Sequence, residues 1–294
     1  MKNPLKKIEH VGLIANPDKV KSATVLKQTA RSIAKAGRIL SVDEATAAIG
    51  VNKAKVLPDA ASLAKVCDLL LVFGGDGTML RVAREAAGIG TPFMGFNMGG
   101  LGFLTAASAK KLTHSLDKLW NGQYTIDSLS MIDASVLPGN RISKHLAVND
   151  VVISRGKIPR LIEASVAVDD EPLTRYRCDG IIISTPAGST AYSLAAGGAV
   201  IAPNAEVFAI TPICPHTLSN RSVIVSIKST ITVEIMDNRA DTFLNTDGKF
   251  KTELAIGDTV TLKRSQQKAR LIRLEGRSFF ETLRHKLQWS GSHV

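Results

Sequence analysis

A chain of 294 residues, 45% of them hydrophobic and 21% charged, has the composition of a globular protein with one large domain or two ordinary ones. No stretch approaches the roughly 18 apolar residues that a membrane-spanning helix needs, and the apolar run at residues 11–15 is too short for a signal peptide. We therefore expect a cytoplasmic protein without a membrane partner. The three cysteines lie far apart, which argues against a disulfide framework or a zinc site.

The net charge of +11 indicates a polyanionic partner but does not say which one. The basic residues are spread along the chain, and the aromatic residues, only 5% of the total, do not alternate with them as stacking platforms would. This distribution disfavours nucleic acid as the main partner. The alternative polyanionic partner is a dinucleotide together with a nucleoside triphosphate.

The first 125 residues alternate between predicted strands and helices. Apolar runs predict buried strands, and 3.6-residue periodicity predicts helices: strands at 8–15, 68–73 and 92–96, and helices at 20–36 and 78–87. A continuous apolar run such as 68–73 is typical of a central strand in a parallel sheet. An α/β domain over residues 1–125 is expected.

From residue 126 the pattern changes to many short strands, including an alternating one at 230–236 and a hairpin at 166–175. We expect a β-rich, sandwich-like second domain over residues 126–274. Ser278 and Glu281 then form a capping box, which predicts a C-terminal helix. With its apolar stripe, this helix is expected to pack back on the first domain, so that residues 275–294 join residues 1–125.

The sequence Gly-Gly-Asp-Gly-Thr at residues 74–78 directly follows the predicted central strand. Glycines there let the backbone approach a phosphate, and Thr78 is expected to cap the following helix, whose N-terminus suits an anion. Asp76 repels phosphate, so its presence implies a proton to accept or a metal ion to hold. A plain strand-to-helix turn is the alternative. The motif is neither a Walker A loop nor a dinucleotide fingerprint.

Four further segments combine strands with polar or glycine-rich loops. They are the glycine loop 97–105, the pair Asn149-Asp150, the hydroxyl-rich loop that follows Asp179-Gly180 and an apolar run, and the Pro-rich segment 211–219. A hydroxyl-rich loop offers neutral donors to phosphates and sugars. Alone, the glycine loop is weak evidence and the pair Asn149-Asp150 is equally compatible with turn chemistry. The Pro-rich segment is expected to be a rigid structural turn. A solvated linker fits the hydroxyl-rich loop poorly, because an apolar run leads into it.

Together these motifs, in this order, resemble the NAD kinase family from about residue 8 to the C-terminal helix. The first motif is shared with phosphofructokinases and lipid kinases, whereas Ser-Thr-Pro-Ala-Gly-Ser-Thr-Ala-Tyr-Ser at 184–193 is far more specific. The resemblance implies phosphorylation of NAD by ATP with Mg²⁺, to give NADP. It also implies a homo-oligomer, expected to be a tetramer, whose neighbouring subunits contribute to the nucleotide site.

The resemblance also implies roles for individual residues. Asp76 would be the proton acceptor, with Gly77 beside it on the dinucleotide, and no protein metal ligand is assigned. Asn149 and Asp150 would hold the adenosine end. The rest of the site would be lined by Asp179, Thr190, Ala191, Tyr192 and Ser193. Plausible phosphate contacts are Arg81, Arg160 and Lys249. Arg177 stands where a charged residue implies preference for NAD over NADH.

Two positions depart from the family pattern. Asp150 stands where many members have Glu, and Gly100 stands where other members have Arg, which puts a phosphate contact there in doubt. Two rival functions stay open. One is a lipid or sugar-phosphate kinase that shares Gly-Gly-Asp-Gly, and the other is a non-catalytic dinucleotide-binding regulator that binds nucleic acid.

Overall fold

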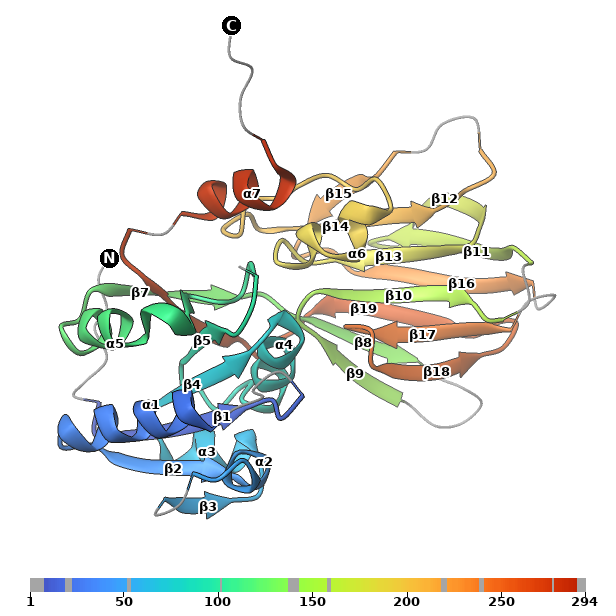
Figure 1. Cartoon of the computed structure of the whole chain (residues 1–294). Coiled ribbons are helices and arrows are strands. Elements are labelled where there is room, and N and C mark those ends of the chain that lie inside the picture. The colour runs from blue at the N-terminus through green and yellow to red at the C-terminus, as the bar shows by residue number, and fades with distance from the viewer. Residues whose placement is uncertain are drawn as a thin grey trace, which may run out of the picture. The chain divides into compact units, whose positions relative to one another are not determined.

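The computed structural model of the chain describes residues 8–18, 23–51, 54–100, 102–136, 143–157, 160–217, 221–237, 241–276 and 278–289. The chain divides into two compact units (Figure 1). The first unit is Met1–Leu129 with Lys268–Val294, and the second is Ser130–Gln267. The expected boundaries were 125/126 and 274/275. They differ because the strands at 124–129 and 269–274 pair with each other in the first sheet.

The first unit is built on a mostly parallel sheet in the order β3-β2-β1-β4-β5-β20-β7, with β6 beside β5. Its strands are β1 (His10–Ala15), β2 (Ile39–Asp43), β3 (Lys55–Leu57), β4 (Leu69–Gly74), β5 (Phe93–Asn97), β6 (Ala107–Ser108), β7 (Tyr124–Leu129) and β20 (Ala269–Leu274). Its helices are α1 (Thr24–Lys35), α2 (Glu44–Ala48), α3 (Ala60–Val66), α4 (Asp76–Glu85), the 3₁₀ turn η1 (Ala109–Lys111), α5 (Leu112–Trp120) and α7 (Phe279–Leu287).

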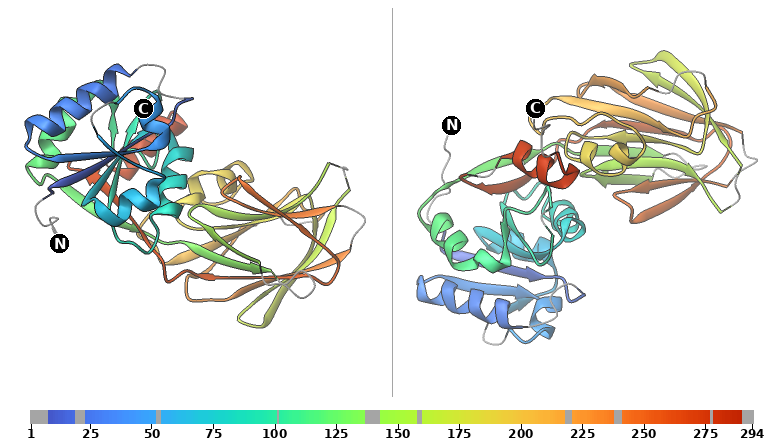
Figure 2. Two further views of the ribbon diagram at one scale, coloured as in Figure 1. Left: turned by 90° about the horizontal axis from the view of Figure 1, so that it is seen from below. Right: turned by 45° about the horizontal axis from the view of Figure 1, so that its top comes forward.

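Helices cover both faces of this sheet (Figure 2): α1 and α5 lie on one face, and α3 and α4 on the other. Every residue of β4 is buried, as its apolar sequence predicts for a strand covered on both faces. The rings of Phe73 in β4 and Phe96 in β5 stack at 4.7 Å between centroids. The predicted α/β domain with a parallel sheet is confirmed.

The strand order reverses between β1 and β4, and the Gly-Gly-Asp-Gly-Thr segment follows β4 at that edge. In open α/β sheets this switch point, beyond the carboxyl ends of the strands, is where ligands bind. Asn16, directly after β1, ties the two strand ends together. Its backbone N–H donates to Phe73 O at 3.0 Å, and its side chain donates to Thr78 Oγ1 at 3.2 Å.

Helix α4 begins two residues earlier than expected. Its N-cap is Gly75, without a side-chain cap hydrogen bond, and Thr78 lies buried in the first turn. The prediction that Thr78 caps the helix is therefore wrong, because the glycine before Asp76 takes the extended cap conformation. The predicted start of the first helix, at residue 20, lies outside the described residues, and α1 is described from Thr24.

The second unit consists of antiparallel sheets packed face to face. One has the order β15-β14-β13-β10-β17-β18 and the other β12-β11-β16-β19-β8-β9. The strands are β8 (Ile132–Val136), β9 (Ser143–Ala147), β10 (Asp150–Arg155), β11 (Ile162–Val168), β12 (Glu171–Cys178), β13 (Gly180–Ser184), β14 (Val207–Ile213), β15 (Val223–Ser226), β16 (Ile231–Asp237), β17 (Thr242–Thr246), β18 (Phe250–Leu254) and β19 (Thr259–Arg264). Inward-facing aliphatic residues of both sheets form one core, as in a sandwich.

The predicted hairpin is present: Asp169 and Asp170 form the turn between β11 and β12, with φ of 51° and 66°. The predicted alternating strand is β16. Over one outer face run the 3₁₀ turn η2 (Gly188–Thr190) and the short helix α6 (Tyr192–Ala195), which contacts β13. The predicted β-rich domain is confirmed.

Helix α7 belongs to the first unit, as expected. Ser278 caps it by accepting the backbone N–H of Glu281 at 3.1 Å, and Leu283 is buried. None of the helices in the described ranges has the length and hydropathy to cross a membrane.

Candidate active site

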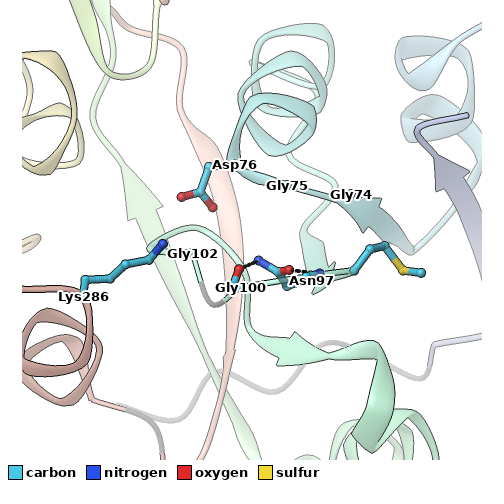
Figure 3. Close-up of a pocket in the computed structure, with 9 residues that line it drawn as sticks. Gly74, Gly75, Asp76, Asn97, Gly100, Gly102 and Lys286 are labelled. Carbon is cyan, nitrogen blue, oxygen red and sulfur yellow. Dashed lines mark hydrogen bonds between the residues drawn. The ribbon is translucent and has the colours of Figure 1, made fainter. Parts of the chain in front are cut away.

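The turn after β4 depends on glycine at its first position. A Cβ on Gly74 would lie 2.4 Å from Thr78 Oγ1, so any larger residue would displace the start of α4. Gly75 is extended, and Asp76 is the first residue of the helix. The turn therefore fixes the backbone of Asp76 at the carboxyl edge of the sheet (Figure 3).

The second glycine loop wraps around the Asp76 carboxylate. Oδ2 accepts the backbone N–H of Phe103 at 3.1 Å, and Oδ1 accepts that of Leu104 at 3.2 Å. A Cβ on Gly102 would lie 2.1 Å from Asp76 Oδ1. Glycine at 102 thus allows the loop to approach the carboxylate closely, and the two N–H donors orient it.

Phe103 is itself held by two groups, Arg273 and Phe279. Its carbonyl oxygen accepts from Arg273 Nη1 of β20 at 3.0 Å, and Arg273 Nε pairs with Asp127 of β7 at 2.6 Å. The Phe103 ring packs against Phe279 of α7, with centroids 5.9 Å apart. The loop that orients Asp76 is therefore anchored to β20 and β7 through Arg273, and to α7 through Phe279.

A cavity of about 300 Å³ opens beside Asp76, and we call it the glycine pocket. Its described lining residues are Gly74, Gly75, Asp76, Asn97, Met98, Gly99, Gly100, Gly102 and Lys286. Asn97 shapes its floor: the side-chain amide donates to Gly100 O, and Oδ1 accepts the Gly99 N–H at 2.5 Å. The ammonium end of Lys286 points toward Gly102 and Asp76 (Figure 3).

Of the residues predicted for this half of the site, Asp76 lines the pocket and Gly77 follows it as an exposed residue. Arg81 faces acids instead. Its guanidinium pairs with Glu85 at 3.2 Å and lies 3.9 Å from Asp43. Asn97 begins the glycine loop 97–105 singled out above, but no role was predicted for it. Lys286 was not predicted, because no motif around it pointed to a ligand.

In the second unit, Asn149 and Asp150 form a tight turn held by Asp247. The Asp247 carboxylate accepts the backbone N–H groups of Val148, Asn149 and Asp150 at 3.1, 2.8 and 3.2 Å. Asp150 is only 5% exposed. Burial, and secondarily the Asp247 charge, raises the pKa of Asp150 to about 7. Asn149 Oδ1 is buried and has no hydrogen-bond partner among the described residues.

The hydroxyl-rich loop packs directly on this turn. Thr185 N donates to Asn149 O at 2.9 Å, and Thr185 Oγ1 donates to Val148 O at 2.7 Å. A Cβ on Gly188 would lie 2.1 Å from Asn149 O, so the loop meets the turn backbone to backbone. The predicted residues 190–193 continue from here: Ser193 is buried on Thr211 at 3.0 Å, and Tyr192 is exposed.

Asp179 lies at the opposite end of β10 and β13, and Arg177 lies two residues before it, in β12 of the other sheet. Asp150 pairs with Ser184, whereas Ser154 pairs with Gly180, so Asp179 is about five residues, or about 15 Å, along the sheet. There Asp179 Oδ1 accepts from Arg155 Nε at 2.6 Å. Arg160 belongs to this end, because Ile162 pairs with Cys178. Lys249 belongs to the Asn149 end, in the turn after Asp247.

Two family models match this chain. That of the ATP-NAD kinase N-terminal domain matches residues 11–124, and that of the ATP-NAD kinase C-terminal domain matches residues 148–274. Together they cover well over half of the sequence. The chain belongs to the NAD kinase family.

Individual relatives agree. The chain is 39% identical over 282 residues to the NAD kinase of Caldanaerobacter subterraneus subsp. tengcongensis, covering 95% of this chain and 99% of the relative. It is 37% identical over 281 residues to the NAD kinase of Lachnoclostridium phytofermentans, covering 93% and 97%.

Solved NAD kinase family structures share the fold. A yeast NADH kinase complexed with NADH superimposes with a TM-score of 0.86 at 24% identity, covering 100% of this chain and 90% of the other. An NAD kinase from Archaeoglobus fulgidus in complex with ATP gives a TM-score of 0.75 at 23% identity, covering 96% and 100%.

The two family models cover different parts of the candidate site. Asp76 and the glycine loop fall in the N-terminal match, and the Asn149 turn and hydroxyl-rich loop fall in the C-terminal one. Lys286 falls in neither. Within the described ranges, no group of three or more His, Cys, Asp or Glu side chains is placed to hold a metal ion.

Proposed function

We propose that this chain transfers the γ-phosphoryl group of Mg²⁺-ATP to the 2′-hydroxyl of the adenosine ribose of NAD, giving NADP and ADP. The observation that carries the proposal is the Asp76 carboxylate, held by two backbone N–H groups at the edge of an open glycine pocket. Membership of the NAD kinase family supports the same reaction.

We assign to Asp76 the role of accepting the proton of the attacking hydroxyl group. A ribose hydroxyl is a poor nucleophile until it sheds this proton, and a positioned carboxylate accepts it as the phosphoryl group arrives. Phosphoryl transfer passes through a loose transition state, so orientation counts for more than basicity. The Phe103 and Leu104 N–H groups supply that orientation by fixing the plane of the carboxylate.

The glycine pocket is assigned to the triphosphate. Gly75, Gly99 and Gly100 leave it without side-chain bulk, so a phosphate chain reaches the backbone. Asp76 is the acidic residue in its lining, which places a carboxylate beside a polyanion. Mg²⁺ would arrive as part of the Mg²⁺-ATP substrate and would offset this repulsion.

The Asn149 turn is assigned to the adenosine end of NAD, with Thr190, Ala191, Tyr192 and Ser193 beside it and Lys249 near its phosphates. The buried Asn149 Oδ1, which lacks a hydrogen-bond partner among the described residues, supports this because a donor from the ligand would satisfy it. Gly77 is assigned to the dinucleotide next to Asp76. Arg81 is engaged by Glu85 and Asp43, so a phosphate contact from it would require that pairing to break.

Asp179, Arg177 and Arg160 are assigned to a site completed by a neighbouring subunit of a homo-oligomer, expected to be a tetramer. The separation of about 15 Å between Asp179 and the Asn149 turn within one chain supports two contributing subunits. A charge at Arg177 is expected to favour NAD over NADH. We further propose a cytoplasmic enzyme without nucleic-acid or membrane partners.

The test is to incubate the purified chain with ATP, Mg²⁺ and one acceptor at a time: NAD, NADH, a diacylglycerol or a sugar phosphate. NADP formed from NAD, at a rate far above that with any other acceptor, is the expected result. Turnover of a lipid or sugar phosphate instead would assign a different kinase. Salt-dependent DNA binding without turnover would instead indicate a non-catalytic, dinucleotide-binding regulator that binds nucleic acid.

A further inference from the structure

Lys286 supplies the positive charge in the glycine pocket. The other described lining residues are glycines, Asn97, Met98 and the acidic Asp76. Gly100 lines the same cavity and brings no side chain. Among the described lining residues, Lys286 is therefore the source of positive charge for a triphosphate, in addition to the Mg²⁺ that arrives with ATP.

The position of Lys286 on α7 is unusual for a surface lysine. Phe279, Leu283 and Lys286 are spaced i, i+4 and i+7, which puts them on one stripe of the helix. Phe279 packs on Phe103, and Leu283 is 4% exposed, so this stripe is the packed one. Lys286 is itself exposed, and it lies at the end of this stripe, where it lines the pocket.

Lys286 is also uncommitted within the described part of the chain. It forms no ion pair or hydrogen bond there, whereas Arg81, Arg155 and Arg273 are each paired with a carboxylate. Basic residues in a last helical turn complement the helix dipole, and Arg284 and His285 share that position. A dipole role alone does not explain why Lys286, and neither of these neighbours, lines the pocket.

We propose that Lys286 binds the phosphate chain of ATP in the glycine pocket. The proposal rests on the function proposed above and names a residue that determines ATP affinity. An ammonium group brings three donors and a compact charge, which suits phosphate oxygens. Lys286 lies on the C-terminal helix, beyond residue 274, where the match to the C-terminal domain model ends.

The experiment compares Lys286→Ala with Arg284→Ala, which removes the same charge from the same turn but from a residue that does not line the pocket. For Lys286→Ala the KM for ATP is expected to rise about tenfold or more, as for loss of a hydrogen bond to a charged group. The KM for NAD should stay within twofold. Arg284→Ala should leave both constants unchanged, and Lys286→Arg should recover part of the ATP affinity.

Calorimetric titration of each variant with Mg²⁺-ATP, without NAD, tests the role of Lys286 in ATP binding separately from the proposed NAD kinase reaction. If the wild type binds ATP but makes no NADP, the proposed function fails, and the binding constants still test Lys286. An unchanged ATP affinity in Lys286→Ala would overturn the inference. So would a selective rise in the KM for NAD, or a fall in kcat alone, because Lys286 would then serve the other substrate or only support the loop.

Discussion

Asp76 and Phe103 are joined by a hydrogen bond of 3.1 Å from the Phe103 N–H to the Asp76 carboxylate, although 27 positions separate them in the sequence. Because Phe103 is also held by Arg273 and Phe279, this bond connects the proposed proton acceptor to β20 and α7. The orientation of Asp76 is thus set by the second glycine loop and by what anchors that loop. The first glycine turn fixes only its backbone.

Substitution of Gly102 by Ala should displace the Asp76 carboxylate. The new Cβ would lie 2.1 Å from Oδ1, so either the carboxylate or the loop must move. We expect kcat to fall at least tenfold, since small displacements of a catalytic group have large effects on rate. Steady-state kinetics of NADP formation measures this.

Gly100→Ala is the matched control, because a Cβ at residue 100 meets no heavy atom within 4 Å. Because Gly100 lines the pocket assigned to the triphosphate, its new Cβ should act on the KM for ATP, and kcat at saturating ATP should change less than twofold. Equal losses in the two variants would mean that the loop tolerates no side chain anywhere, and the specific contact between Gly102 and Asp76 would lose its support.

Asp150 should make the stability of the protein depend on pH. Its pKa is raised in the folded state to about 7, from an ordinary value near 3.8, so the folded chain binds the extra proton between these values. The stability that comes from a neutral Asp150 is fully present below about pH 4 and is lost as the pH rises to about 7. Above that pH, the loss is complete.

Asp150→Asn is neutral at every pH and should not show this loss. Relative to wild type, its free energy of unfolding should rise by about 2–3 kcal/mol between pH 5 and pH 8, at 1.36 kcal/mol per pKa unit. Urea unfolding of both proteins across this range measures the difference. Parallel pH profiles for the two proteins would show that Asp150 is ionised in the fold at pH 5.

Asp76→Asn and Asp179→Asn should complement each other if the protein is an oligomer with shared sites. Each variant alone should be nearly inactive. In a mixed oligomer, some sites would combine the intact Asp76 of one chain with the intact Asp179 of another, and partial activity should return. Co-expression followed by activity assay and sedimentation is the measurement. A 31.4 kDa monomer, or no recovery in mixed oligomers, would contradict shared sites.

Local patterns were sufficient to predict the layers of the fold. The buried run of β4, the alternation of β16 and the Ser278 cap each depend on a few adjacent residues, and the structure has all three. Of the predicted capping box, it shows the bond from the Glu281 N–H to Ser278 Oγ. The Asn149 turn and the hydroxyl-rich loop were also recognised from their own sequences, and they lie against each other.

The contacts that finish the pocket could not be predicted in this way. The Phe103 and Leu104 N–H groups carry no side-chain signature, and Lys286 looks like an ordinary base in a last helical turn. The helix start was misassigned to Thr78 because, in a Gly-Asp-Gly-Thr sequence, either Gly75 or Thr78 is a plausible cap. Only the packing of the turn decides between them.

Replacement of Asp76 by Asn removes the proposed proton acceptor with little change of shape. The amide keeps one oxygen to accept from Phe103 or Leu104, but its NH₂ group faces the other donor. We expect a loss of stability of about 1–3 kcal/mol. Asp117→Asn, the same change at an exposed residue of α5, is the control and should affect neither stability nor rate.

The most direct test of the role proposed for Asp76 is kcat for NADP formation by Asp76→Asn. It is measured together with NAD affinity on the same folded preparation. Loss of a positioned base costs about 10²–10⁴-fold in rate, or roughly 3–5 kcal/mol of barrier. We predict a fall in kcat of that size with NAD binding retained. A fall of less than tenfold would contradict it, because Asp76 would then not accept the proton, even if the protein still makes NADP.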